Sequence, residues 1–596
     1  MENTVKARLD ALRACMASAE LDACIIPTDD VHQSEYVCAR FRYREWLSGF
    51  TGSAGVLAVS RKRAGLWTDS RYYLQAEKEL EGSGITLFRA TEPDTLSMED
   101  WLVREGCRAV GFDGEVFPAG RARQLKAALE ARNCWVCPTF QSYDRVWKDR
   151  PALPSDPIWV YDEKYAGESF DSKLARLRGR LAALGADTLP VSTLDDIAWL
   201  FNLRGSDVEC NPVGLAFALI EPAKVTLFVS AKKLTSAAKR YLSERQVIIR
   251  PYRMFCSVLR RLPAKARVLT DTQRINYAVF KALSAKVVKV EALSPLTEMK
   301  AVKNPVEIEG FRKAVVQDGV TLLRLWKWME ETIGRGETLS EYAIAERLMN
   351  LRRADGNCFG ESFAPIVSFN ANGAIVHYEP SPEQSAPVTG NGILLIDSGG
   401  QYMEGTTDIT RTYSFYEADA TPDAYKKDYA AVLKGNIALA GCRFPEQTRG
   451  ASLDVLARQF LWQQGAHYGH GTGHGIGHFL NVHEGPQSIR REENPVVLRP
   501  GMVISDEPGV YRTGAYGVRL ENMILCEEKE TTGFGTFQGF ETLTLFPFDR
   551  KSIDRKYFTR AEIAWINRYH QRVYQALAPH LTAEEQAWLK EKTKTI

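Results

Sequence analysis

The pattern of apolar and polar residues near the N-terminus predicts a helix followed by a strand. Apolar positions recur at helical spacing among charged residues in the first part of MENTVKARLDALRACMASAELDACIIP, which ends in a short apolar run. The order of helix, short loop, strand and Asp pair occurs twice, in ARLDALRACMASAELDACIIPTDD and in KLARLRGRLAALGADTLPVSTLDD. Unless this similarity is coincidental, the chain contains two similar α/β domains, residues 1–155 and 156–300, joined near the Pro-rich segment PALPSDPIW.

A third pattern begins near EMKAVKNPVEIEGF and predicts a larger domain over residues 301–545. Pro305 opens a strong helical pattern that runs to about Glu331, because proline is favoured in the first turn of a helix. The segment TLSE at Thr338 has the form of a capping box and predicts that the next helix opens there. Strands and hairpins then follow to about Leu545.

Residues 546–596 predict a C-terminal helical extension. Capping boxes at Thr559 (TRAE) and Thr582 (TAEE) each precede an amphipathic helical pattern. One apolar stripe of the first helix consists of Trp565, Ile566, Tyr569 and Val573. We interpret this stripe as a packing surface rather than as part of a functional site.

Acidic residues end or interrupt the apolar strands of the third domain. Asp397 directly follows the apolar run from Gly392 to Ile396, and Asp408 lies eleven residues further on, in the next predicted strand. A hairpin can bring two such positions side by side. Further along, Glu507 follows another apolar strand, and GVRLENMILC alternates so that Arg519, Glu521 and Met523 share one face. Acidic residues are rarely buried in strands without a partner, so four of them together indicate that they share one binding partner.

Five of the nine histidines lie in the segment AHYGHGTGHGIGHFLNVHEG. Its alternating glycines disfavour a helix, since each costs a helix interior about 1 kcal/mol, and they favour a bare loop close to a ligand. The spacing HxxxH resembles zinc proteases of the HExxH type, but the glutamate and the helix are missing, which excludes that class. Imidazoles in such a loop can bind metal or move protons; the simpler alternative is a polar surface loop.

These acids and histidines predict a site for two divalent cations. Carboxylates this close together would raise one another's pKa unless positive charge compensates them. Two ions about 3.5–4 Å apart can acidify a shared water and polarise a scissile carbonyl. The predicted ligands are Asp397, Asp408, His474, Glu507 and Glu521. This set is rich in hard oxygen, with one imidazole and no thiolate, and it favours Mn²⁺, with Co²⁺, Fe²⁺ or Zn²⁺ as alternatives.

The order of the motifs Asp-x10-Asp, HGTGHGIG, DEPG and RLEN resembles that of the pita-bread metallopeptidases, which include methionine aminopeptidase, prolidase and Xaa-Pro aminopeptidase (aminopeptidase P). The segments DVHQSEY, FTGSAG, WTDSRYYLQA, NANGAIVHYEP and FLNVHEGP are similar to the long, three-domain, cytosolic aminopeptidase P. The resemblance implies an α/β (α+β) protein: two creatinase-like α/β domains, then a pita-bread catalytic domain with a C-terminal helical extension. His478 stands where this family is expected to have a small or apolar residue, so we assign it no role and place it behind the ligands or on the surface.

The resemblance implies a dinuclear metallo-aminopeptidase that removes an N-terminal residue when proline follows it. Asp397 is then expected to bind one ion and His474 the other. Glu507 binds the second ion and takes the proton of the water, and the hydroxide that bridges the metals attacks the scissile carbonyl. Asp408 and Glu521 bridge both ions.

Further residues are expected to contact the peptide. The resemblance implies that His377, His470 and His483 bind the substrate and stabilise the tetrahedral intermediate. Arg71 would reach the substrate from the first domain, and Arg519 would offset acid charge beside Glu521 and contact the substrate. The alternatives are a strand-end histidine at His377, a surface ion pair at Arg71 and a solvated strand residue at Arg519.

Composition adds limits to these expectations. The net charge of +2, from 76 basic and 74 acidic residues, gives no general reason to expect nucleic acid or membrane partners. No apolar run of 18 residues exists, and the N-terminus lacks a signal-peptide core, so we expect a cytoplasmic protein. The eleven scattered cysteines are expected to be mostly buried free thiols, and the isolated CxxC at Cys134 and Cys137 gives only weak support for a redox or zinc site. The resemblance implies a homodimer.

Two other functions remain open. A prolidase would act on Xaa-Pro dipeptides and would need a device that holds the dipeptide carboxylate. A non-catalytic pita-bread module would bind peptides, histones or RNA, but such proteins typically lose metal ligands, whereas all five positions are filled here.

Overall fold

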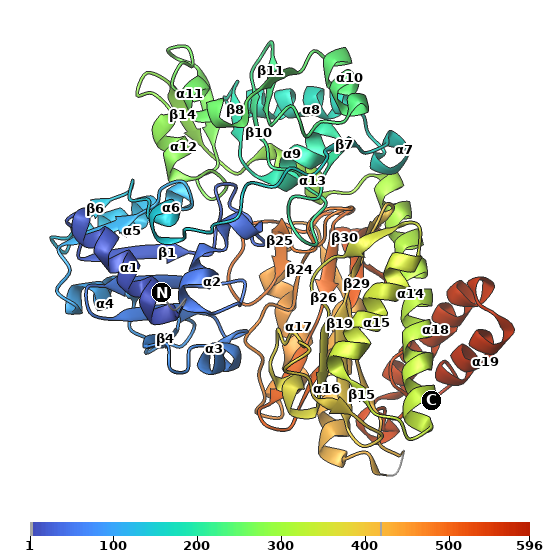
Figure 1. Cartoon of the computed structure of the whole chain (residues 1–596). Helices are drawn as coiled ribbons and strands as arrows, with labels where there is room; N and C mark the ends of the chain where they lie inside the picture. The colour runs from blue at the N-terminus through green and yellow to red at the C-terminus, as the bar shows by residue number, and fades with distance from the viewer. Residues whose placement is uncertain (1–3, 418–419) are drawn as a thin grey trace. The chain divides into compact units, whose positions relative to one another are not determined.

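The structure, a computed structural model, describes residues 4–417 and 420–596 (Figure 1). Its contacts divide the chain into two units. Unit 1 extends to Thr297 without the segment Lys164–Gly167, and unit 2 consists of that segment and Glu298–Ile596. None of the described helices has the length and apolar character needed to cross a membrane.

The first half of unit 1 is built on a six-stranded sheet of order β4-β3-β2-β1-β5-β6. Helix α1 (Val5–Ser18) leads into the central strand β1 (Ala23–Pro27), as the sequence predicted. Alternate residues of β1 enter two apolar cores, one that contains α1 and one on the opposite face of the sheet. The other strands are β2 (Val56–Ser60), β3 (Ala64–Thr68), β4 (Ile85–Arg89), β5 (Ala109–Phe112) and β6 (Trp135–Cys137).

The second half of unit 1 repeats this sheet. Its strands are β8 (Leu189–Val191), β10 (Phe217–Ile220), β11 (Val225–Phe228), β12 (Ile248–Arg250), β13 (Arg267–Thr270) and β14 (Val288–Glu291). They follow the order and the parallel or antiparallel pairing of β1 to β6, with one bridge between Thr188 and Val268 joining β8 to β13. The internal repeat predicted from the sequence is therefore confirmed.

In unit 2, two sheets carry the predicted site. A sheet of order β17-β19-β22 contains β17 (Ile366–Phe369), β19 (Ile393–Ser398) and β22 (Ile409–Ser414). A larger sheet of order β23-β30-β29-β26-β24-β25 contains β23 (Arg443–Pro445), β24 (Gly473–Gly475), β25 (Glu484–Ile489), β26 (Val503–Asp506), β29 (Asn522–Thr532) and β30 (Gly535–Thr542). The hairpin of β27 (Gly509–Arg512) and β28 (Tyr516–Arg519) connects β26 to β29.

Long helices pack around these sheets. They are α14 (Pro305–Gly334), α15 (Glu341–Ala354), α16 (Asp423–Ala440) and α17 (Gly450–Trp462). In Figure 1, α14 and α15 lie side by side. Trp326 of α14 is almost completely buried, and its ring lies 3.9 Å from that of Tyr413 in β22. The helix opening at Pro305 is confirmed, with Asn304 as its N-cap.

Helix α15 begins later than the sequence predicted. Its N-cap is Ser340 instead of Thr338, because Leu339 and Ser340 form a short strand with Pro387 and Val388. The carboxylate of Glu341, which the capping box would have used, accepts hydrogen bonds from the backbone N–H groups of Phe369 (2.6 Å) and Ala386 (2.7 Å). Tertiary contacts thus override the local capping motif.

The C-terminal extension forms α18 (Arg560–Leu577) and α19 (Ala583–Lys592), and the capping boxes at Thr559 and Thr582 are present as predicted. The indole N–H of Trp588 and the ammonium group of Lys592 both donate to Glu330 of α14, at 2.9 and 2.6 Å. Both helices lie beside α14 (Figure 1). The extension is therefore part of unit 2 and packs against α14.

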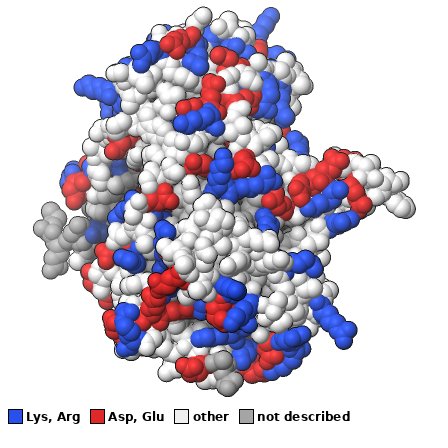
Figure 2. Space-filling model, turned by 90° about the vertical axis from the view of Figure 1, so that its right-hand side faces the viewer, with Lys and Arg blue, Asp and Glu red and all other residues white. Residues whose placement is uncertain are grey.

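The surface charges are mixed in sign, and the cysteines are less buried than expected. On the face seen in Figure 2, acidic and basic side chains are interspersed. All eleven cysteines are free thiols, but five are buried and six are half-buried, so the expectation that most are buried is wrong.

Candidate metal centre

The two predicted aspartate ligands lie at one end of the β19–β22 pair. Asp397 is the last residue but one of β19, and it pairs with Thr410 of β22. Asp408 directly precedes β22 and therefore lies just outside the strand in which the sequence placed it. Because the strands are antiparallel, the end of β19 and the start of β22 meet, as the hairpin argument required.

His474 is the central residue of β24, so the prediction that the His-rich segment is a bare loop is wrong for this part of it. The glycines on each side allow neighbouring backbones to approach it. A Cβ atom at Gly473 would lie 1.9 Å from the carbonyl oxygen of Ser505, and one at Gly475 would lie 2.4 Å from that of Glu484. The glycines are thus required for pairing around His474.

The two glutamates lie where the chain leaves a strand. Glu507 directly follows β26, as predicted. Glu521 lies between β28 and β29, so the single alternating strand predicted for GVRLENMILC is wrong. The chain changes partners there, since β28 pairs with β27 whereas β29 pairs with β26 and β30.

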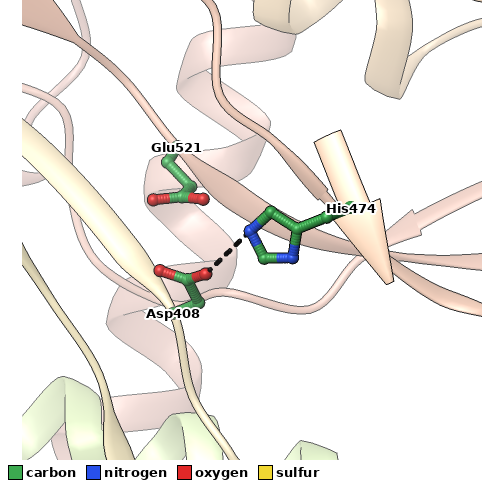
Figure 3. A group of neighbouring side chains, drawn as sticks. All are labelled: Asp408, His474 and Glu521. Atoms are coloured by element: carbon green, nitrogen blue, oxygen red, sulfur yellow. Dashed lines mark ion pairs between the residues drawn. The ribbon is translucent and has the colours of Figure 1, made fainter. Parts of the chain in front are cut away.

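Asp408, His474 and Glu521 meet at one point (Figure 3). Each offers one potential ligand atom, and these atoms lie within 4.8 Å of one another. The Nε2 atom of His474 lies 3.4 Å from Oδ2 of Asp408 and 3.6 Å from Oε1 of Glu507. The structure therefore brings four of the five predicted ligands into one cluster.

His474 presents Nε2 to the acids because its other ring nitrogen is engaged. Nδ1 donates to the carbonyl oxygen of Gly475 at 2.9 Å, and the backbone N–H donates to Oγ of Ser505 at 3.0 Å. This arrangement leaves the lone pair of the neutral imidazole on Nε2, the form that binds a metal ion.

Asp397 is held by Arg519. Nε and Nη2 of Arg519 donate to Oδ2 of Asp397 at 3.0 and 2.6 Å. Arg519 is only 2% exposed, so the alternative of a solvated strand residue is wrong, and its guanidinium offsets acid charge. The other oxygen of Asp397, Oδ1, is buried and has no hydrogen-bond partner among the described residues. This oxygen is suited to bind a cation.

The carboxylates carry more negative charge than this buried site tolerates without cations. Burial raises the pKa of Glu507 to about 7 and that of Glu521 well above its usual range, and the charges of Asp408 and Asp397 add to both effects. Burial also raises the pKa of Asp397, although Arg519 opposes it.

His474 shows the same excess of negative charge. Burial lowers its pKa, but hydrogen bonding to Asp408 and the charge of Glu507 outweigh burial and raise the pKa to about 9. A cation would replace the proton that these acids otherwise place on the imidazole. The convergent oxygens, the single imidazole and the unpartnered Oδ1 of Asp397 therefore fit divalent cations.

Two further histidines border the cluster. Nε2 of His470 lies 2.7 Å from the hydroxyl of Tyr511, and its Nδ1 lies 3.8 Å from Oε2 of Glu507. The ring of His483 packs edge-on against that of His474, with centroids 4.4 Å apart. Both are near the predicted ligands, and their contact with substrate remains a prediction.

His377 follows the 3-10 helix η3 (Asn370–Ala374) in a turn, so it is not a strand-end histidine. The carbonyl oxygen of the preceding Val376 accepts a hydrogen bond of 3.3 Å from Nη2 of Arg519. The backbone beside His377 is thus tied to the residue that holds Asp397.

His478 and Arg71 have other contacts. His478 is buried rather than on the surface, and its ring packs edge-on against Phe311 of α14 at 5.3 Å.

Arg71 belongs to unit 1, where its Nε and Nη2 each donate to Asp69 at 2.8 Å. That pair agrees with the ion-pair alternative, and a role of Arg71 in substrate binding remains a prediction.

Two hydroxyl groups at the site, those of Thr410 and Tyr511, were not predicted from the sequence. Oγ1 of Thr410 donates to Oε2 of Glu521 at 2.8 Å. The hydroxyl of Tyr511 accepts a hydrogen bond of 2.8 Å from Nη1 of Arg519. The hairpin pairing of β27 with β28 places Tyr511 near Arg519, and the alternation of both strands was the available signal.

The chain matches known families along nearly its whole length. Residues 309–528 match the model of metallopeptidase family M24, and residues 536–596 match the C-terminal region of peptidase M24. Residues 8–140 and 149–307 match two models of the creatinase/prolidase N-terminal domain.

Similar proteins agree with these matches. The probable Xaa-Pro aminopeptidase P of Coprinopsis cinerea is 39% identical, covering 99% of this chain and 98% of the relative, and aminopeptidase P2 of Arabidopsis thaliana is 38% identical, covering 97% and 86%. The X-prolyl aminopeptidase of Caenorhabditis elegans, described as a cytosolic enzyme with a di-nuclear active site, has a structure that superimposes with a TM-score of 0.95 at 30% identity, covering 100% of each chain. The chain therefore belongs to metallopeptidase family M24, within the group of full-length relatives of Xaa-Pro aminopeptidase P.

Proposed function

We propose that this protein is a metallo-aminopeptidase that hydrolyses the bond between an N-terminal residue and a following proline, with two divalent cations at the site described above. The convergence of Asp408, His474 and Glu521 on one point carries this proposal. The full-length similarity to Xaa-Pro aminopeptidases supports the choice of substrate.

We assign the ligands as follows: Asp397 to one ion, His474 and Glu507 to the other, and Asp408 and Glu521 to both. When bound, the ions supply an acidified water for attack and polarise the scissile carbonyl. Arg519 holds one oxygen of Asp397 and leaves Oδ1 available. The hydrogen bond from Nδ1 to Gly475 keeps Nε2 of His474 directed at the acids.

Proton transfer is assigned to Glu507. Its carboxylate lies in the cluster of proposed ligands, with Oε1 3.6 Å from Nε2 of His474, so it is placed to take the proton of the attacking water. Oε2 of Glu507 lies 3.8 Å from Nδ1 of His470. We assign His470, together with His377 and His483, to hydrogen bonds that orient the peptide and stabilise its tetrahedral oxyanion.

We further propose that the metal is Mn²⁺, because the donor set is rich in oxygen. Arg71 is assigned to substrate binding from unit 1, and Arg519 to the charge balance of the site and to substrate contact. The proposed domain limits are residues 1–155, 156–300, 301–545 and 546–596. We also propose a cytoplasmic homodimer; the description of the C. elegans relative as cytosolic supports that location.

Chelation followed by metal addition tests the proposal. Demetallated protein should not release the first residue of an Xaa-Pro peptide, and Mn²⁺ should restore turnover better than Zn²⁺, Co²⁺ or Fe²⁺. Full activity of metal-free protein would contradict the two-metal site. Restoration by Zn²⁺ alone would contradict only the choice of Mn²⁺.

A further inference from the structure

Arg411 of β22 is a buried cation that forms no ion pair with any carboxylate in the described part of the chain. Its side chain is only 2% exposed. Buried guanidinium groups are normally paired with an acid or surrounded by acceptors. Here the surroundings are carbonyl, amide and phenol oxygens, and they belong to two different parts of unit 2.

On one side, Arg411 holds the backbone of the metal centre. Its Nη1 donates to the carbonyl oxygen of Thr410 at 3.0 Å and to that of Glu521 at 2.6 Å. The backbone N–H of Glu521 in turn donates to the carbonyl of Thr410 at 3.0 Å. These contacts and the Thr410 hydroxyl fix the position from which the Glu521 carboxylate extends.

On the other side, Arg411 contacts the C-terminal region. Its Nη2 donates to the carbonyl oxygen of Phe546 at 2.7 Å and to the hydroxyl of Tyr569 at 2.9 Å. The guanidinium also lies over the ring of Phe548, 4.4 Å from its centroid. Arg411 thus joins the strand beside the metal centre to α18.

The hydroxyl of Tyr569 completes this arrangement. Besides accepting from Arg411, it has the carbonyl oxygens of Thr544 and Phe546 as acceptors for its own hydrogen, each at 3.0 Å. Tyr569 is 5% exposed, so loss of the hydroxyl would leave buried polar groups without a partner. The apolar stripe of α18, predicted to be a packing surface, therefore also carries a polar contact with Arg411.

We propose that Tyr569 and Arg411 are positioning residues for the metal centre, and that α18 belongs to the scaffold of the active site. Tyr569, together with Oδ1 of Asn522 at 2.9 Å, holds Nη2 of the guanidinium, and the guanidinium fixes the carbonyl groups on which the geometry of Thr410 and Glu521 depends. This inference rests on the proposed dinuclear site. Groups behind metal ligands typically change metal affinity about 10–100-fold when they are removed.

Tyr569→Phe tests the proposal, because it removes one oxygen and keeps the packed ring. The demetallated full-length variant is titrated with Mn²⁺ by calorimetry, and its melting temperature is measured without metal. We expect Mn²⁺ affinity to fall by about 10-fold or more. Tyr574→Phe is the matched control, since Tyr574 is a half-buried tyrosine that packs against the same core from the same helix.

The outcomes separate the inference from the function on which it rests. Wild-type affinity in Tyr569→Phe contradicts the positioning role, and so does an equal loss of affinity in Tyr574→Phe. Weaker Mn²⁺ binding in Tyr569→Phe alone, measured at a temperature at which the melting curves show both metal-free variants folded, supports it. A wild-type protein that binds fewer than two Mn²⁺ ions contradicts the proposed function itself.

Discussion

At the scale of single residues, Arg519 shows how a buried acid cluster is balanced without losing its ligands. Its guanidinium binds Oδ2 of Asp397 and leaves Oδ1 without a partner among the described residues. Its Nη1 binds Tyr511, which also contacts His470. One cation therefore reduces the charge of the site and connects a ligand to a histidine beside it.

The two adjacent imidazoles should differ in function. His474→Ala should bind less metal, because its Nε2 faces Asp408 and Glu507. His483→Ala should keep both ions but lower kcat by about 10²–10³-fold if His483 stabilises the transition state. Metal per chain, measured by mass spectrometry, and kcat distinguish them. Equal metal loss in both variants would contradict this division.

The bridging assignment predicts a strong response to small changes in an acid. Asp408→Ala and Glu521→Ala should each lose at least one ion and nearly all turnover. Asp408→Glu should also fail, because one added methylene displaces the ligand oxygens. Asp423→Ala, an exposed aspartate of α16, is the control that should keep both ions. Two ions with normal turnover in the Asp408 or Glu521 variants would remove those residues from the site.

The proposed ligands and their neighbours were predictable to different degrees. Asp397, Asp408, Glu507 and Glu521 could be proposed as ligands because acids at the ends of apolar strands need a partner. Thr410 could not be recognised, and Tyr511 only through the alternation of β27 and β28, since a threonine and a tyrosine are ordinary strand residues whose function depends on what faces them. His478 shows the opposite case, a histidine of the motif that packs against Phe311.

At the scale of elements, predictions from local sequence signals fail where a segment pairs with distant parts of the chain. The capping boxes of α18 and α19 formed as predicted, whereas the one at Thr338 did not, because Glu341 binds the backbone of other segments. The His-rich segment gains a short strand because Gly473 and Gly475 allow close pairing with its neighbours. These outcomes depend on contacts between residues distant in the sequence, which no local pattern contains.

The contact between α14 and α15 should depend strongly on one buried ion pair. Arg352 donates to Asp318 at 3.0 Å, contacts Glu361, and donates to Oγ of Ser398 beside Asp397 at 3.1 Å. Asp318→Ala should lower the free energy of unfolding by about 3–5 kcal/mol, because it leaves a buried charge only partly compensated. Urea unfolding measures this change. Glu530→Ala, in an exposed pair with Arg443, should cost no more than about 1 kcal/mol. An equal loss in both variants would show that the buried pair stabilises the fold no more than a surface pair does.

His570 of α18 should make stability depend on pH. Burial lowers its pKa to about 3, and Nε2 accepts a hydrogen bond of 3.1 Å from the backbone N–H of Phe548. Below about pH 6.5 the unfolded chain binds a proton at this histidine and the folded chain does not. The free energy of unfolding therefore decreases as the pH is lowered from about 6.5 towards the folded pKa of about 3.

A non-titrating acceptor isolates this effect. His570→Gln keeps an oxygen for Phe548 and carries no titratable group. Between about pH 7.5 and about pH 5, the wild type should lose about 2 kcal/mol more free energy of unfolding than the variant. Parallel pH dependence of the two proteins would show that His570 is protonated in the folded state.

At the scale of the whole molecule, the repeat and the order of motifs were the strongest signals. The two sheets of unit 1 share strand order and pairing, as the repeated segments around Asp30 and Asp196 predicted. The sequence could not predict that α18 contacts Arg411, because the stripe that carries Tyr569 has the spacing of an ordinary packing surface. Substrate contact from unit 1 through Arg71 remains a prediction.

Selectivity for the substrate depends on the complete site. Proline lacks the amide N–H and fixes φ near about −65°, so a site can select its bent backbone. A free amine is a better metal ligand than an acetylated one, so a blocked N-terminus should prevent cleavage. A tripeptide should be cleaved at least as well as the matching dipeptide if the protein is an aminopeptidase rather than a prolidase.

The most direct test measures release of the first residue by the Mn²⁺-loaded protein from Arg-Pro-Pro, Arg-Pro, Arg-Ala-Ala and acetyl-Arg-Pro-Pro. We predict that arginine is released rapidly from Arg-Pro-Pro, no faster from Arg-Pro, and scarcely at all from the other two peptides. A strong preference for Arg-Pro would indicate a prolidase, and turnover of the acetylated peptide would exclude recognition of the free amine. Equally fast cleavage of Arg-Ala-Ala and Arg-Pro-Pro would contradict the assignment as an Xaa-Pro aminopeptidase.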